Sequence, residues 1–379
     1  MIYFDNAATG GRKPDGVLTA VHSAVKVCAN PGRGAHKLSL SCASLVQDTR
    51  NALNLFFNGY GFDRVIFTKN CTEALNIALL GTLRKGDHVI VSCAEHNSVL
   101  RPLQHLKSLG IIEYDVCPLQ GEVQNGNAFL NPKDIQKRIK PNTRLVAVTL
   151  ASNVNGYIPH IEQISSILPA NVLLLCDGAQ AGGHIHIDMQ QLGIDLLSLA
   201  GHKGLLGIQG SGALLFSERV FPQPILFGGT GSLSISLDMP DFYPDALEAG
   251  TLAFPAIISL LEGVRYLAQH EKHIQSRLLM LTAYLLNGLT RLNNYTVYSK
   301  ANPCGIVAFC HKTLPSEFLS QTLSEKYDIA VRGGLHCAPL MHKALKTQEN
   351  GLIRVSFSHF NSEREIDQLL TALCQIDDT

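Results

Sequence analysis

Short apolar segments alternate with amphipathic stretches through the first two-thirds of the chain. Nearly continuous apolar runs predict strands at residues 63–68, 88–92, 144–150, 171–176, 195–199 and 212–216. The periodicity between them predicts helices at residues 72–83, 98–109 and 132–139. Strands and helices in alternation predict an α/β domain with a mainly parallel sheet, because helices cover both faces of such a sheet.

The pattern changes beyond residue 220. Residues 221–255 are rich in Gly, Ser, Asp and Pro and are predicted to be loop, whereas residues 257–292 have a long helical pattern. A smaller α+β unit is predicted after this helix. We therefore expect a large domain over residues 16–260 and a small α+β domain made of residues 1–15 and 261–379.

Composition narrows the class of protein. The 379 residues include 31 Lys and Arg and 31 Asp and Glu, so the net charge is zero. The chain therefore lacks the positive charge that would attract nucleic acid or an anionic membrane. Only 16% of the residues are charged, against about 25% in an average soluble domain. This low fraction indicates an additional buried face, such as an oligomer interface.

Cysteine use and the first residues favour a cytoplasmic protein. The ten Cys are scattered without a Cys-x-x-Cys pair, which argues against a zinc ribbon or a redox dithiol. The chain begins without a basic segment followed by an apolar run, so we expect no signal peptide. The longest apolar runs are far shorter than the roughly 20 residues that cross a bilayer.

Two predicted strands deliver polar side chains to one edge of the sheet. The strand at 171–176 leads into Asp177, and the strand at 195–199 leads into Gly201-His202-Lys203. Ligands of open α/β sheets bind at these carboxyl ends. A Lys and an Asp there suit pyridoxal phosphate, in which the Lys bonds to the aldehyde and the Asp holds the ring nitrogen protonated. A buried Lys–Asp ion pair is the alternative.

A phosphate site is predicted where the helix at 72–83 begins. Free backbone N–H groups and the helix dipole favour an anion beside Asn70-Cys71-Thr72, and the Thr72 hydroxyl adds a donor. Asn70 with Glu73 three residues later also fits an ordinary capping box, and the two interpretations are compatible.

Two groups near the C-terminus are suited to act on a substrate. Cys337 lies in a Gly-rich segment with Arg332 and His336. Nearby cations lower the pKa of a thiol, so Cys337 is a candidate nucleophile, with an inert buried Cys as the alternative. Arg354, on an alternating strand pattern, suits a substrate carboxylate, or else forms a surface salt bridge.

One short segment resembles a metal site. His184, His186 and Asp188 alternate, which would place them on one face of a strand. No fourth ligand is indicated and the preceding Gly182-Gly183 indicates a turn, so metal binding is not favoured.

Taken together, these segments closely resemble the class V aminotransferase-like enzymes of fold type I, which bind pyridoxal phosphate. Among them the chain is similar to cysteine desulfurases and selenocysteine lyases of the second group. The resemblance spans essentially the whole chain and rests on motifs at residues 3–9, 33–36, 94–97, 152–153, 176–180, 201–203, 248–251 and 336–338, and on Arg354. It implies a large domain with a mainly parallel, seven-stranded type of sheet and a smaller α+β domain.

The resemblance implies a set of cofactor-binding residues. They are Cys71, Thr72, His96, Asn153, Asp177, Gln180, His202, Lys203 and Thr251. Lys203 resembles the lysine that bonds to the aldehyde, and Asp177 the partner of the pyridinium nitrogen. Gln180 resembles the donor to the phenolic oxygen, and His96 the imidazole stacked on the ring. Thr251 would come from the second subunit of a dimer with shared active sites.

The residues that would bind the cofactor phosphate differ from those of many relatives. Thr72 and His202 resemble phosphate ligands, but many relatives have Gly-Thr-Thr where this chain has Asn70-Cys71-Thr72, and Ser where it has Ala200. Two hydroxyl donors are therefore missing. We expect weaker retention of the cofactor unless backbone N–H groups compensate.

The resemblance also implies the reaction. L-cysteine would be converted to L-alanine, with Lys203, Cys337 and His96 as catalytic residues and the sulfur carried on Cys337 as a persulfide. Substrate contacts would come from Arg354, Asn153, His36 and Arg332. The short loop around Cys337 favours transfer to a dedicated acceptor protein.

Other activities remain open at this stage. Selenocysteine lyase uses nearly the same residues. A cysteine or cystine C–S lyase would give pyruvate and ammonia without a nucleophilic Cys, and a transaminase would leave Cys337 idle. A non-catalytic partner in sulfur trafficking is disfavoured by the presence of both Lys203 and Cys337.

Overall fold

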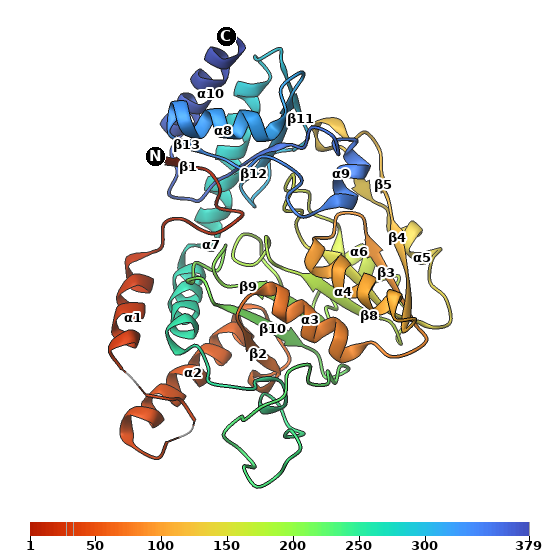
Figure 1. Cartoon of the computed structure of the whole chain (residues 1–379), viewed down its shortest axis with the longest axis vertical. Helices are drawn as coiled ribbons and strands as arrows, with labels where there is room; N and C mark the ends of the chain where they lie inside the picture. Colours follow the sequence, from red (N-terminus) through yellow and green to blue (C-terminus); the bar gives the residue numbers. More distant parts are fainter. Residues whose placement is uncertain (28, 33, 379) are drawn as a thin grey trace.

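A mainly parallel sheet forms the core of the larger part of the molecule (Figure 1). The computed structural model describes residues 1–27, 29–32 and 34–378. In these ranges seven strands form the sheet, in the order β2-β10-β9-β8-β7-β3-β4. β10 is antiparallel to both of its neighbours and the other pairs are parallel, which confirms the predicted fold class. The strands are β2 (Val65–Thr68), β3 (Asp87–Ser92), β4 (Ile112–Cys117), β7 (Thr143–Thr149), β8 (Leu173–Asp177), β9 (Leu196–Ala200) and β10 (Gly212–Phe216).

Helices cover both faces of this sheet, as the apolar strands require. Along β8, Leu173 and Leu175 pack in the cluster shared with α3 and α4, whereas Leu174 and Cys176 pack in the cluster shared with α2 and α7. The helices are α1 (Asp15–Lys26), α2 (Lys37–Phe56), α3 (Cys71–Thr82), α4 (Asn97–Ser108), α5 (Pro132–Gln136), α6 (Ile161–Ser165), α7 (Phe254–Leu289), α8 (Ser316–Tyr327), α9 (Pro339–Leu345) and α10 (Glu363–Asp377).

A smaller α+β part follows α7. Its antiparallel sheet has the order β11-β12-β14, and β1 pairs in parallel with β13, so the first residues lie beside the C-terminal part (Figure 1). This pairing supports the proposed assignment of residues 1–15 to the small domain, whose exact borders stay a prediction. The short strands are β1 (Ile2–Tyr3), β5 (Leu119–Gln120), β6 (Phe129–Leu130), β11 (Tyr295–Val297), β12 (Ile306–His311), β13 (Ile329–Ala330) and β14 (Ile353–Ser356).

The predicted elements differ from the structure in a few places. The helix expected at residues 132–139 is only α5, and α1 and α2 were not predicted. β4 was not predicted either, because it is an edge strand that carries Glu113 and Asp115 among its apolar residues. Within the described ranges, the helices lack the combination of length and apolar character that spanning a membrane requires.

Candidate active site

Several segments that are distant in the sequence meet at one edge of the central sheet. β8 ends at Asp177, β9 ends just before Lys203, and α3 begins at Cys71. Side chains from these segments and from the start of α4 line one cavity. It brings together a large share of the predicted site residues, namely Cys71, Thr72, His96, Asn153, Asp177, Gln180, His202 and Lys203.

Asp177 and Lys203 have the environments that the predicted roles need. Asp177 is buried, and its Oδ1 accepts hydrogen bonds from Ala179 N–H at 2.9 Å and from the Cys71 thiol at 3.4 Å. Burial lowers the pKa of Lys203, and the nearby Arg354 charge lowers it further. Among the described residues no salt bridge joins Lys203 to Asp177, but the Asp177 charge acts on Lys203 and opposes the lowering of its pKa.

The first turn of α3 contains the predicted capping interactions, and the phosphate site there stays a prediction. Asn70 caps the helix by accepting from Glu73 N–H at 2.9 Å, while the Glu73 carboxylate accepts from Lys69 N–H. Thr72 faces the cavity, where its hydroxyl lies 2.8 Å from Ser98 Oγ. Ser98 was not predicted, although it supplies another hydroxyl to this cavity.

Two histidines of the cavity are neutral. His96 caps α4, and its Nδ1 accepts from Ser98 N–H at 3.0 Å, so the ring proton is on Nε2; burial lowers the pKa of His96. Burial and the charges of Lys203 and Lys13 lower the pKa of His202 to about 4. His202 Nδ1 lies 3.1 Å from Thr9 Oγ1. Neither imidazole therefore adds a positive charge near neutral pH.

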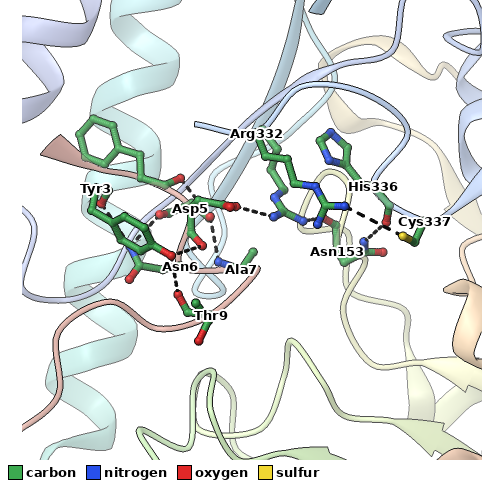
Figure 2. A network of polar contacts seen from close by, with 12 residues as sticks. Tyr3, Asp5, Asn6, Ala7, Thr9, Asn153, Arg332, His336 and Cys337 are labelled. Atoms are coloured by element: carbon green, nitrogen blue, oxygen red, sulfur yellow. Dashed lines mark hydrogen bonds and ion pairs between the residues drawn. The ribbon is translucent and has the colours of Figure 1, made fainter. Parts of the chain in front are cut away.

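Cys337 is exposed, which excludes the alternative of an inert buried cysteine. Its Sγ lies 4.0 Å from Arg332 Nη2 (Figure 2). Cys337 lines a hollow of about 460 Å³ together with Thr72, His96 and Ser98, which also line the Lys203 cavity. The thiol and the amine therefore face adjoining spaces.

Arg354 is buried, so the alternative of a surface salt bridge is wrong. The side chain is 1% exposed; its Nη2 donates to Asp5 Oδ1 at 2.7 Å and its Nη1 to Asn153 O at 3.0 Å. Asn153 in turn donates through Nδ2 to His336 O at 2.7 Å. Figure 2 shows Asp5, Asn153 and Arg332 in this network.

Two predicted residues lie away from the Lys203 cavity, the Cys337 hollow and the Arg354 network in a single chain. His36 is exposed and caps α2 by accepting from Ser39 N–H at 3.3 Å. Thr251 is on the exposed segment before α7, where it borders a separate hollow with Lys69. Thr251 was expected to act on a second subunit, and its role and that of His36 stay predictions. Arg33, in the same motif as His36, lies outside the described residues.

The three side chains of the apparent metal segment have different partners. His184 Nδ1 lies 2.8 Å from Gln180 O, His186 pairs with Glu271, and Asp188 accepts from the Asn58 amide. Over residues 1–27, 29–32 and 34–378, no three potential metal ligands form a cluster.

Glu95 is a buried carboxyl behind the cavity that the sequence did not single out. Its Oε1 accepts from Ser92 Oγ–H at 2.5 Å and from Thr149 N–H at 2.8 Å. Burial raises the pKa of Glu95 to about 8, and the Asp177 charge contributes to the rise. Glu95 precedes His96 directly, so the two hydrogen bonds that Glu95 accepts help to hold the turn that presents His96.

We expect this carboxyl to make stability depend on pH. Between its ordinary value of 4.5 and about 8, folded Glu95 holds a proton that the unfolded chain has lost. Its stabilising contribution is therefore complete below pH 4.5 and is lost as the pH rises to about 8. As the pH rises from about 5 to about 8, the Tm of Glu95→Gln should fall less than the Tm of the wild type, as measured by thermal denaturation. Equal losses in both proteins would contradict a protonated Glu95.

A family model, relatives of known sequence and a solved structure each match nearly the whole chain. The Aminotransferase class-V model matches residues 2–369. The chain is 32% identical to a probable cysteine desulfurase of Methanothermobacter thermautotrophicus, over 99% of this chain and 94% of that protein. It is also 32% identical to one of Pyrococcus abyssi, over 98% and 93%. The apo structure of a cysteine desulfurase from Thermococcus onnurineus matches with a TM-score of 0.88 at 30% identity, over 99% of this chain and 94% of that one. The chain therefore belongs to the class-V aminotransferase family.

Proposed function

We propose that this protein is a pyridoxal-phosphate-dependent cysteine desulfurase, which converts L-cysteine to L-alanine and takes the sulfur onto Cys337 as a persulfide. The position of Cys337 carries the proposal. Its exposed thiol lies 4.0 Å from Arg332 Nη2 and borders a hollow that shares lining residues with the Lys203 cavity. Whole-chain similarity to proteins named cysteine desulfurases supports the same activity.

The residues around Lys203 fit pyridoxal phosphate. They combine an amine of lowered pKa, the buried Asp177 carboxylate and the N-terminus of α3 with the Thr72 hydroxyl. Gln180 Nε2 donates to Ala7 O at 2.9 Å, and the buried Oε1 has no hydrogen-bond partner among the described residues, so the amide offers a ligand an acceptor as well as its second N–H. Lys203 would bond to the aldehyde, Asp177 would hold the ring nitrogen, and His96 would stack on the ring. When bound, pyridoxal phosphate holds the substrate amino group covalently and withdraws electrons from Cα.

The protein side chains then have distinct tasks. Arg354 binds the substrate carboxylate, and Lys203 Nζ accepts the Cα proton, because its lowered pKa leaves part of the amine neutral. The Cys337 thiolate attacks the substrate sulfur. An S–S bond forms as the C–S bond breaks, and the electron pair of the C–S bond stays with the carbon. Protonation of that carbon, Cβ, and return of a proton to Cα then give L-alanine.

The proposal includes a homodimer with shared active sites. The segment between β10 and α7 exposes apolar side chains that a partner subunit would cover, among them Phe221, Phe227, Leu233, Ile235 and Leu237. Thr251 lies at the end of this segment. We also propose a protein acceptor for the sulfur and a cytoplasmic location, where reducing conditions keep thiols such as Cys337 free.

Product analysis tests the proposed function. The purified protein with pyridoxal phosphate is given L-cysteine, and alanine and pyruvate are both quantified. Alanine formed together with protein-bound persulfide supports a desulfurase, whereas pyruvate with ammonia would identify a C–S lyase. Competition between L-cysteine and L-selenocysteine then separates sulfur from selenium preference. A protein that forms neither product would contradict an enzymatic role.

Cys71→Thr should strengthen cofactor binding. The Cys71 thiol donates to Asp177 Oδ1 at 3.4 Å, so the prediction requires the threonine hydroxyl to turn from that carboxylate to the phosphate at the start of α3, and one hydrogen bond typically changes affinity by about fivefold. The Kd for pyridoxal phosphate is measured by absorbance titration of cofactor-depleted protein. Cys374→Thr, on α10, is the control and should leave the Kd unchanged. An unchanged Kd for Cys71→Thr would show that backbone N–H groups already compensate.

A further inference from the structure

Arg354 is a buried charge whose partner comes from the other end of the chain. Its Nη2 donates to Asp5 Oδ1 at 2.7 Å, across 349 positions in the sequence. In the described ranges, no other carboxylate forms an ion pair with Arg354. The two members of the pair differ in exposure, since the Arg354 side chain is 1% exposed and that of Asp5 is 23% exposed. Loss of the Asp5 charge would therefore leave a buried, unpaired guanidinium, whereas loss of the Arg354 charge would leave a carboxylate that water still reaches. The first loss costs more free energy of folding.

Backbone hydrogen bonds hold Asp5 in place on both sides. Ser356 N–H donates to Phe4 O at 2.7 Å, and Asn6 N–H donates to Ser356 O at 3.3 Å. Ala7 N–H donates to the Ser356 hydroxyl at 2.9 Å. The segment around Asp5 thus follows β14, the strand that carries Arg354, and Figure 2 shows Asp5 pointing toward the arginines of the network. This geometry fixes the carboxylate against the guanidinium.

The guanidinium still has donors to spare. Of its five N–H groups, one goes to Asp5 and one to Asn153 O, and Nε is buried without a partner among the described residues. A buried donor without an acceptor is costly, so an oxygen atom of a ligand is expected there. Asp5 occupies one edge of the guanidinium and leaves the remaining donors for that ligand.

We propose that Asp5 is a positioning residue for substrate recognition. Asp5 is the internal counterion of Arg354 when no substrate is bound, and it shares the guanidinium with the α-carboxylate of the amino acid when one is bound. Because the two carboxylates compete for one positive charge, Asp5 weakens carboxylate binding and allows the product L-alanine to leave. The inference rests on the proposed function for the identity of the amino-acid ligand.

Asp5→Asn tests the competition in the holoenzyme. The Asn keeps the shape and one acceptor but removes the charge, so Arg354 is left with an uncompensated charge. We expect a lower Tm without ligand and a Kd for L-alanine about tenfold tighter than that of the wild type, within the usual range for two coupled ligands of one group. L-alanine should also raise the Tm of the variant more than that of the wild type. The Kd is read from the cofactor absorbance and the Tm from thermal denaturation.

Two controls separate this effect from a general loss of structure. Ethylamine, which is alanine without its carboxylate, should bind both proteins equally. Asp328→Asn removes an acid of the C-terminal part that pairs with the first residues of the chain, through the Met1 amine at 2.6 Å, and should change neither readout. Asp5→Glu, which keeps the charge, should restore most of the Tm.

A double variant keeps the inference testable if Asp5→Asn folds poorly. Asp5→Asn with Arg354→Met removes both charges, so the double variant should regain the Tm that the single variant loses. A double variant as unstable as Asp5→Asn, an Asp5→Asn Kd for L-alanine that is unchanged or weaker, or a wild type that binds no L-alanine would each overturn the inference. None of these readouts requires turnover. A protein that binds L-alanine in this way but does not form it from L-cysteine would contradict the proposed function alone.

Discussion

Replacing Cys337 with serine should lower alanine formation from L-cysteine by roughly a thousandfold, because a hydroxyl at neutral pH is a far weaker nucleophile toward sulfur than a thiol beside a cation. The Arg332 guanidinium lies 4.0 Å from the sulfur that would attack the substrate. Alanine is measured over time, and the persulfide is measured as one added sulfur atom on the protein by mass spectrometry. In Cys337→Ser the added sulfur should be absent, and alanine should form at the lowered rate.

The cofactor spectrum distinguishes a lost nucleophile from a damaged site. Cys337 borders the hollow beside the Lys203 cavity and is not among the residues that line the cavity itself, so the absorbance of bound pyridoxal phosphate should be unchanged. Cys374→Ser is the matched control, since Cys374 is also exposed but lies on α10. Undiminished alanine formation by Cys337→Ser would mean that another group accepts the sulfur, and Cys337 would no longer be the nucleophile.

The core of the site could be predicted because it is built from strand ends. Asp177 and Lys203 follow continuous apolar runs, and such runs become neighbouring parallel strands whose carboxyl ends meet at one edge. The residues next to each other in the sequence are thus enough to predict which side chain lies at the end of a strand. The same holds for Thr72, which follows the cap of α3.

The polar contacts that complete the site could not be predicted, because they depend on tertiary contacts. Nothing near Asp5 in the sequence indicates that its carboxylate meets Arg354. Glu95 stands in a polar stretch with His96, where an exposed carboxylate is the ordinary expectation, and only the packing of the sheet buries it. Ser98 resembles any serine in a first helical turn until the fold brings it within 2.8 Å of Thr72 Oγ1. The contacts of these three residues join segments that are distant in the sequence or buried only by packing, so they can be known only from the folded structure.

Lys203→Ala should have the largest effect on turnover, a loss of about 10⁴-fold, because the same amine is proposed to hold the cofactor and to accept the Cα proton. The absorbance of lysine-bound pyridoxal phosphate should be absent, even with excess cofactor. Lys326→Ala, an exposed lysine on α8, is the control and should change neither property.

Chemical rescue tests the acid–base role of Lys203 separately from cofactor attachment. The pKa of Lys203 is lowered by burial, so a small free amine such as methylamine, supplied to Lys203→Ala, should restore part of the turnover and more of it as the pH rises and the added amine loses its proton. A role limited to covalent attachment predicts that rescue does not follow the neutral fraction of the added amine. Full turnover by Lys203→Ala without any added amine would contradict both roles. It would also contradict the assignment of this cavity as the reaction centre.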